Sequence, residues 1–83
     1  MTDGLIHLDE SLNIGVTIKE HRKSRGITQN ELADYTGLSR AGIAKIEAGE
    51  SDIKLSTLIS ISNLLGLDLY LRERGTKRGL KDE

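Results

Sequence analysis

The feature that most limits the folds open to this chain is a pair of short helix signals separated by a glycine. In "TQNELADYT", Thr28 and Glu31 have the S/T-x-x-E spacing of a capping box, in which a hydroxyl oxygen and a carboxylate accept from free N–H groups at a helix start. Gly37 follows, a residue that adopts the left-handed conformation ending a helix at little cost. Ser39 can then cap another helix, over about 40–48. The sequence therefore predicts two short helices joined by a tight turn.

Helical periodicity extends over most of the remaining chain. A helix is predicted over about 11–25, because apolar residues recur on one side and Gly26 can end the helix. The residues on that side are Leu12, Ile14 and Ile18, with His21 as a candidate fourth member. A fourth helix in "STLISISNLLG" carries an apolar stripe, although the residues before it offer no strong cap. Gly66 ends it, and Leu58, Ile61, Leu64 and Leu65 form the stripe.

After Gly66 the apolar period changes from that of a helix to that of a strand. Leu67, Leu69 and Leu71 alternate with polar or aromatic residues. A lone strand needs a partner for its N–H and C=O groups, and the chain itself offers only the short "LIHL" at 5–8. A second copy, pairing antiparallel across a two-fold axis, is the more economical partner. An extra loop or a helix extension remains the alternative.

Size and composition limit the classes of function. The 83 residues can enclose one core, contain no cysteine, and include no apolar run of membrane-spanning length. The acidic start "MTDGLIHLDE" lacks a signal-peptide pattern, so we expect a cytoplasmic protein. No nucleophile with a base or phosphate loop is visible, and only His7 could join His21 on a metal. We expect no enzyme, cofactor, metal or membrane partner.

Charge is mixed but uneven along the chain. The formal net charge is −1. Basic residues cluster in "KEHRKSR" at 19–25 and return at Arg40, Lys45 and Lys54, so one face could still be positive. The alternative is an ordinary solvated helix surface.

The motifs "ITQNELADYTGLSRAGIAKIEAGE" and "LSTLISISNLLGL" resemble the lambda-repressor-like, Cro-type (XRE) helix-turn-helix family over about 14–67. The resemblance implies an all-α, four-helix DNA-binding domain, followed here by the β-strand that we expect to pair across a homodimer. It divides the chain into an N-terminal extension at 1–10, the helix-turn-helix domain at 11–66, a dimerisation strand at 67–74 and a polar, flexible tail at 75–83. A purely structural helical bundle is the alternative.

The resemblance assigns DNA-binding roles to matching positions. Gln29 would grip a phosphate and support the recognition helix, and Ser39 would cap that helix and contact phosphate. Arg40 can offer two donors to guanine, and the Ala41 methyl can contact thymine. The missing side chain of Gly42 would allow close approach to the groove. Lys45 would reach a base or phosphate, and Lys54 is the last candidate for DNA contact.

Other positions are given structural roles. The resemblance implies an ion pair between Arg22 and Glu47 that ties the first helix to the third. His21 stands where the family usually has an apolar residue, so it is expected to be a partly buried core histidine. Glu50 and Asp52 depart from the family, which often places basic or polar phosphate-binding groups in this loop. Either the loop stays away from the DNA backbone or Lys54 compensates. The core is expected to include Leu32, Ile43, Ile46, Leu58 and Leu65.

The ending "LGLDLYLRER" resembles the HipB-like antitoxins, which implies a dimeric repressor that binds its own operator and a kinase-like toxin. The strand residues Leu67, Leu69, Tyr70 and Leu71 would then form the interface between subunits. The implied partners are a second copy, an inverted-repeat operator in double-stranded DNA of a bacterium or phage, and the toxin. A stand-alone phage-type or chromosomal repressor is the first alternative. A protein-interaction adaptor with little DNA binding, motivated by the acidic loop, is the second.

Overall fold

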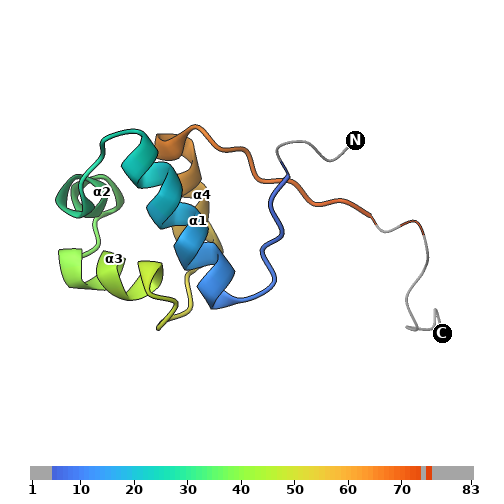
Figure 1. Cartoon of the computed structure of the whole chain (residues 1–83), viewed down its shortest axis with the longest axis horizontal. Helices are drawn as coiled ribbons and strands as arrows, with labels where there is room; N and C mark the ends of the chain where they lie inside the picture. Colours follow the sequence, from blue (N-terminus) through green and yellow to red (C-terminus); the bar gives the residue numbers. More distant parts are fainter. Residues whose placement is uncertain (1–4, 74, 76–83) are drawn as a thin grey trace.

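The structure, a computed structural model, describes residues 5–73 and 75 of the chain, and its described part contains four helices and no strand (Figure 1). The helices are α1 (Ser11–Ser24), α2 (Gln29–Thr36), α3 (Arg40–Glu47) and α4 (Leu55–Leu65). The predicted all-α, four-helix architecture is confirmed. None of the helices in this part of the chain is both long enough and apolar enough to span a bilayer.

The helix ends follow from local side-chain chemistry. The Thr28 hydroxyl accepts from the Glu31 N–H at 3.0 Å, and the Glu31 carboxylate accepts from the Thr28 N–H at 2.8 Å. This is the predicted capping box. Gly37 takes a φ of 79° and ends α2, as its lack of a side chain permits. The N-cap of α4, Lys54, makes no side-chain capping bond, in agreement with the weak start expected there.

The core lies where α1 and α4 pack against α2 and α3. Its fully buried aliphatic side chains come from three of the four helices and are Leu32, Ile43, Ile61 and Leu65. Ile18 from α1, Ala33 from α2 and Ile46 from α3 complete the same cluster, while Leu58 is half-buried against it. Packing of these apolar side chains, rather than helix propensity, stabilises helices as short as α2 and α3.

Periodicity alone misplaced one position on α1 and gave no prediction for another. Leu12 was expected on the apolar side, yet it is 53% exposed because it lies in the first turn, beyond the core. Gly15, which carried no prediction, is buried directly against the end of α3. A Cβ atom at Gly15 would lie 2.7 Å from the Glu47 carbonyl oxygen, so only glycine allows the two backbones to approach this closely.

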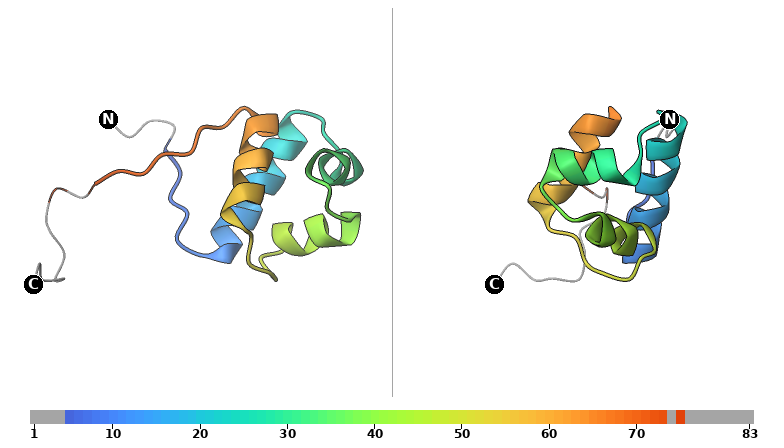
Figure 2. Two further views of the ribbon diagram at one scale, coloured as in Figure 1. Left: turned by 180° about the vertical axis from the view of Figure 1, so that it is seen from behind. Right: turned by 90° about the vertical axis from the view of Figure 1, so that its left-hand side faces the viewer.

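Two extended segments, 5–10 and 67–73, leave the helical body on the side away from α2 and α3 (Figures 1 and 2). The Leu67 N–H donates to the Ser62 carbonyl at 2.8 Å, and no other backbone hydrogen bond joins 67–73 to the described residues. The predicted strand is therefore extended but unpaired in a single chain. Most of the predicted tail, 76–83, and Arg74 lie outside the described residues.

Candidate nucleic-acid interface

The N-terminal turn of α3 is the accessible part of the helix-turn-helix unit. Arg40, Ala41 and Lys45 are exposed, whereas Ile43 and Ile46 on the opposite face of α3 are buried in the core. The right-hand view of Figure 2 looks onto the end of the molecule formed by α2 and α3. The helix is therefore anchored on one face and open on the other, as a helix that inserts into a groove must be.

Ser39 holds the start of this helix. Its Oγ accepts from the Gly42 N–H at 3.0 Å, which leaves the hydroxyl hydrogen free to donate to an incoming acceptor. Gly42 is half-buried, and a Cβ there would lie 3.3 Å from the same Ser39 oxygen. The missing side chain at Gly42 therefore relieves crowding at the cap, in addition to keeping this part of the helix surface small.

A buried ion pair connects α1 to the end of α3. The Arg22 Nε lies 2.6 Å from the Glu47 Oε2, and its Nη2 lies 3.0 Å from Oε1. The remaining Arg22 nitrogen, Nη1, donates to the Ile27 carbonyl at 2.8 Å. Two parallel bonds between a guanidinium and a carboxylate fix geometry as well as distance, so this pair constrains the orientation of α3 relative to α1.

Gln29 joins the same network, a contact that the sequence did not reveal. Its amide nitrogen donates to the Glu47 Oε1 at 3.1 Å, so α1, α2 and α3 meet at one carboxylate. The residues involved are 18 positions apart in sequence, and no local pattern marks such a contact. The amide oxygen of Gln29 and the free N–H groups at the start of α2 remain available to a ligand.

A shallow hollow lies beside the start of α2, and Arg40 and Gln29 both border it. Lys23 and Asn30 also line it, although neither was singled out as a candidate. Lys23 belongs to the basic run at 19–25, which was the available signal. The cationic side chains that line the hollow are Arg22, Lys23 and Arg40, and cations around the positive end of a helix dipole make a suitable environment for an anion.

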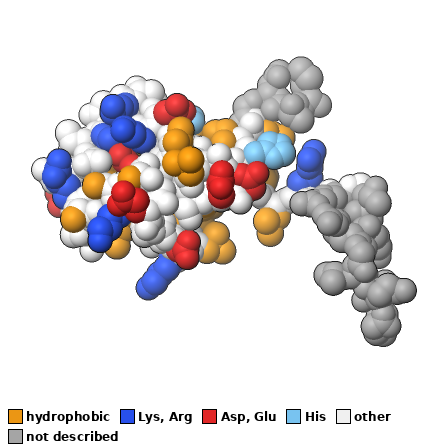
Figure 3. All heavy atoms as spheres, turned by 60° about the horizontal axis from the view of Figure 1, so that its bottom comes forward, with side chains coloured by type: hydrophobic (Ala, Val, Ile, Leu, Met, Phe, Trp, Pro, Cys, Tyr) orange, Lys and Arg blue, Asp and Glu red, His pale blue; other side chains and the backbone are white. Residues whose placement is uncertain are grey.

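The charge around this end of the molecule is mixed. Figure 3 shows separate basic side chains spread over the end where α2 and α3 lie, with acidic side chains among them. A single continuous positive face, which the sequence left open, is not what this view shows.

The acidic loop after α3 is partly tied back to the domain. The Asp52 carboxylate accepts from the Ser11 hydroxyl at 3.2 Å, which connects the loop to the first residue of α1. Glu50 and Lys54 are exposed, and the Glu50 N–H donates to the Lys45 carbonyl at 2.9 Å. Asp52 thus has a structural partner, whereas Lys54 remains free to balance Glu50.

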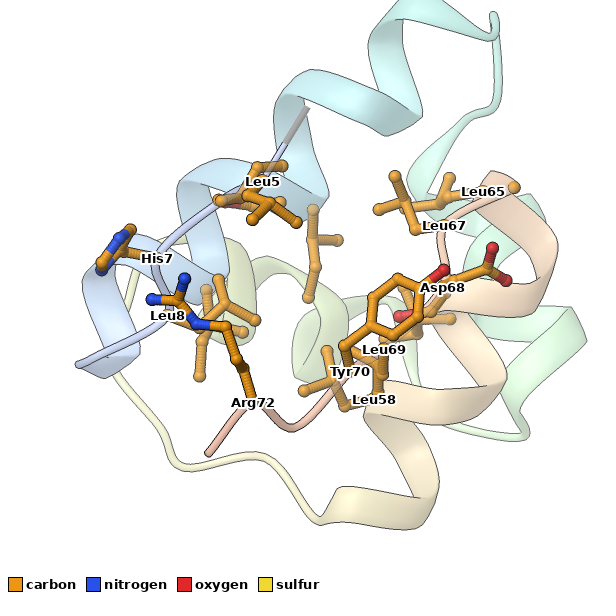
Figure 4. A pocket seen from close by; sticks show the side chains of 17 residues that line it. Leu5, His7, Leu8, Leu58, Leu65, Leu67, Asp68, Leu69, Tyr70 and Arg72 are labelled. Carbon is orange, nitrogen blue, oxygen red and sulfur yellow. The ribbon is translucent and has the colours of Figure 1, made fainter. Parts of the chain in front are cut away.

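The predicted dimerisation residues lie at the other end of the molecule, around an apolar groove (Figure 4). The groove has a volume of about 510 Å³, with Leu5, His7 and Leu8 on one side and Leu67, Leu69 and Tyr70 on the other. Leu71 is fully exposed, and Tyr70 is 76% exposed. The juxtaposition of 5–8 with 67–70 brings together the two segments that could supply strands.

These features define a helix-turn-helix fold in which a short second helix is presented to solvent. A family model described as "Helix-turn-helix" (HTH_3) matches residues 18–71. The match covers more than half of the chain, and the chain therefore belongs to this helix-turn-helix family.

Several bacterial and phage proteins are similar in sequence. The chain is 37% identical over 62 residues to an uncharacterized SPbeta prophage-derived HTH-type transcriptional regulator of Bacillus subtilis (strain 168), covering 75% of the chain and 57% of that protein. It is 38% identical over 58 residues to the immunity repressor protein of Bacillus phage phi105, covering 70% of the chain and 40% of that protein. The control protein C.SmaI of Serratia marcescens is 32% identical over 66 residues, covering 80% of the chain and 76% of that protein. The chain thus spans about half the length of the first two relatives.

Solved structures with the same fold include one determined in complex with DNA. A chain of the HipA-HipB-O2-O3 complex matches with a TM-score of 0.67 and 27% identity, covering 81% of this chain and 94% of that one. The master regulator for biofilm formation SinR, solved in complex with DNA, matches with a TM-score of 0.61 and 28% identity, covering 66% of this chain and 89% of that one. These similarities provide the context for a functional proposal.

Proposed function

We propose that this protein is a dimeric, sequence-specific DNA-binding repressor. The observation that carries the proposal is the exposed face of α3, which presents Arg40 and Ala41 in its first turn and Lys45 one turn further along, while the Arg22–Glu47 ion pair holds the C-terminal end of the helix. Relatives named as transcriptional regulators and as an immunity repressor support the same reading. The likeness to SinR, which was solved in complex with DNA, supports duplex DNA as the ligand.

Phosphate binding would position the protein on the duplex. In this proposal a phosphate oxygen occupies the hollow at the start of α2, where the free N–H groups of that helix, Gln29 and Lys23 converge. The Ser39 hydroxyl donates to a neighbouring phosphate while its oxygen continues to cap α3. Lys54, which is exposed, is proposed to add a further phosphate contact. Such contacts fix register but carry no sequence information.

Base recognition would come from the exposed face of α3. Arg40 is proposed to donate to guanine O6 and N7, and Ala41 to contact a thymine methyl. Gly42 follows Ala41, and its missing side chain allows the helix to approach the groove closely. Lys45 reaches a base or phosphate one turn further along. Because Arg40 also borders the phosphate hollow, its alternative role is to hold the backbone. The two roles differ in a measurable way, since only base contacts separate operator from random DNA.

Dimerisation through 67–71 would complete the interface. Apart from the Leu67 N–H, the backbone of this segment makes no hydrogen bond to the described residues, and Leu67 and Leu69 line an apolar groove. Antiparallel pairing with a second copy satisfies those backbone groups and removes Leu69 and Leu71 from water. A two-fold dimer places two α3 helices in successive major grooves about 34 Å apart, so the operator is an inverted repeat.

An autoregulating antitoxin of a toxin–antitoxin operon is the finer form of this proposal. It is supported by the match to a chain of the HipA-HipB-O2-O3 complex, which extends over 81% of this chain and therefore beyond the helix-turn-helix unit. The partner would be a kinase-like toxin. A stand-alone phage-type or chromosomal repressor is the second candidate, favoured by the similarity to the phi105 immunity repressor. Co-purification of this chain with the product of the adjacent reading frame separates them, because only the antitoxin requires a stable complex.

A gel-shift experiment on the protein's own promoter region tests the DNA-binding proposal. The log of the affinity should fall linearly with the log of the salt concentration, because Lys and Arg release counterions from the phosphates. Arg40→Ala should lose preference for the operator over random duplex, whereas Gln29→Ala should weaken binding to both. Equal losses for Arg40→Ala on both DNAs would assign Arg40 to the backbone. Absence of any shift at low salt would reject DNA binding.

A further inference from the structure

The segment 67–72 carries opposite charges at positions that a symmetric pair of strands could bring together. Asp68, Tyr70 and Arg72 are spaced by two residues, so in an extended chain they lie on one face. All three border the apolar groove (Figure 4), and Asp68 and Arg72 are exposed and form no ion pair with any described residue. Their charges are therefore available to a second copy of the chain.

Symmetry restricts how two copies of this strand can pair. In an antiparallel pair the residues directly opposite each other point to the same face, and side chains alternate between faces along a strand. The two-fold axis between identical strands must therefore lie level with one residue, and that residue is directly opposite the same residue of the second copy. Within 67–73, an axis at Leu69 pairs 67–71, an axis at Tyr70 pairs 67–73, and an axis at Leu71 pairs 69–73 and leaves Asp68 without a described partner. The registers centred on Leu69 and on Tyr70 therefore remain.

The two registers differ in what faces Asp68 and Arg72. A centre at Leu69 sets Asp68 opposite Tyr70, and Arg72 opposite Gly66. Gly66, however, has a φ of 73° as the left-handed cap of α4 and cannot belong to the strand. A centre at Tyr70 instead sets Asp68 of each copy opposite Arg72 of the other, twice in the dimer. Opposite charges directly across a strand pair stabilise it, and like charges destabilise it.

We propose that two copies of this chain pair antiparallel through 68–72 in the register centred on Tyr70, fixed by two reciprocal Asp68–Arg72 ion pairs. This inference rests on the proposed dimer and deepens it. In this register Leu71, which is fully exposed in the single chain, faces the partner's Leu69, which borders the groove. The occupant of the groove mouth is thus the strand of a second copy, and the pairing covers the most exposed apolar side chain of the described residues.

Introduced cysteines measure the register directly, because the chain contains none of its own. Directly opposite residues have Cα atoms about 4.5–5.5 Å apart, within the range of a disulfide, whereas diagonal neighbours lie about 7–8 Å apart, outside it. We expect Tyr70→Cys to form at least about tenfold more covalent dimer under mild oxidation than Leu69→Cys, its matched control. The reverse ratio would assign the register to Leu69 and overturn the proposal.

Charge reversal provides an independent measurement on the intact chain. Asp68→Arg and Arg72→Asp each set like charges opposite one another, so each should raise the dimer Kd in sedimentation at least about fivefold. The double variant restores both pairs and should return the Kd to within about twofold of the parent. High salt should shrink the single-variant effects, since these charges are exposed. Additive losses in the double variant would overturn the register.

The outcomes also separate this inference from the proposed dimer itself. If Leu69→Arg dissociates the dimer while neither charge reversal affects it, the strand interface stands and the Tyr70 register is wrong. If Leu69→Arg leaves a dimer intact, the interface lies elsewhere and both proposals fail. Circular dichroism of each variant confirms that α1–α4 remain folded, as expected for exposed positions outside the helices.

Discussion

At the scale of single residues, the carboxylate of Glu47 connects three helices. It accepts from Arg22 through two bonds and from Gln29 through a third, and it is almost completely buried. Removing one partner of such a pair leaves an uncompensated charge in the interior. We expect Glu47→Ala to lower the free energy of unfolding by about 3–5 kcal/mol in urea titrations. Exposed Glu50→Ala, the control, should change it by less than about 0.5 kcal/mol, and equal effects would contradict the network.

Gly15 provides a second prediction at the residue scale. Replacing glycine by alanine inside a helix normally raises the free energy of unfolding by up to about 1 kcal/mol. At Gly15 the added methyl would meet the carbonyl oxygens of Ile46 and Glu47, so we expect Gly15→Ala to destabilise the protein by about 1–3 kcal/mol. Gly42→Ala, where the nearest atom is a side-chain oxygen at 3.3 Å, should cost less. Thermal unfolding of both variants tests this, and a stabilised Gly15→Ala would refute the close approach of α1 and α3.

At the scale of the element, Ser39 combines a capping role with a proposed phosphate contact. Ser39→Asp retains a side-chain oxygen for the Gly42 N–H and should keep stability close to that of the parent, but its charge should repel DNA. Ser39→Ala loses the cap and should lower the free energy of unfolding by about 1 kcal/mol. Urea unfolding and gel shift on the same samples separate the roles. Undiminished operator binding by Ser39→Asp would place phosphate elsewhere.

The elements were largely predictable from sequence because their ends depend on local chemistry. The capping box at Thr28, the glycine at Gly37 and the hydroxyl at Ser39 act within three or four residues, and the helices begin and end within a residue or so of the predicted positions. The Gln29–Glu47 bond and the Gly15 contact join residues far apart in sequence. Such contacts depend on how the helices pack, which periodicity alone does not specify.

At the scale of the whole molecule, the proposed dimer interface at 67–71 determines whether one or two copies of the domain bind the same DNA duplex. We expect Leu69→Arg to yield monomers in sedimentation, because a charge in the paired leucine face must be desolvated, and to abolish operator binding with it. An arginine at exposed Ile59, on α4, is the matched control and should leave the dimer intact. A dimer that persists in Leu69→Arg would move the interface elsewhere.

The strand illustrates why the assembly was less predictable than the domain. Alternating leucines predicted a strand, and no strand is assigned within the described residues. Pairing requires a second chain, and a single chain shows only an extended segment with unpaired backbone and exposed side chains. The groove beside it was also unforeseen, because it depends on the approach of 5–8 to 67–70 across the molecule. Sequence indicated the two segments, and the fold brought them to one surface.

The distance between the two α3 helices in the dimer tests the central claim most directly. A single spin label attached through Ala41→Cys lies on the exposed N-terminal turn of α3, and the chain has no other cysteine. Pulsed dipolar spectroscopy of the free dimer should give one narrow distance close to the ~34 Å repeat of the duplex. A distance below about 20 Å, or no dipolar coupling at concentrations where the protein is dimeric, would contradict a dimer built to place both helices in successive major grooves.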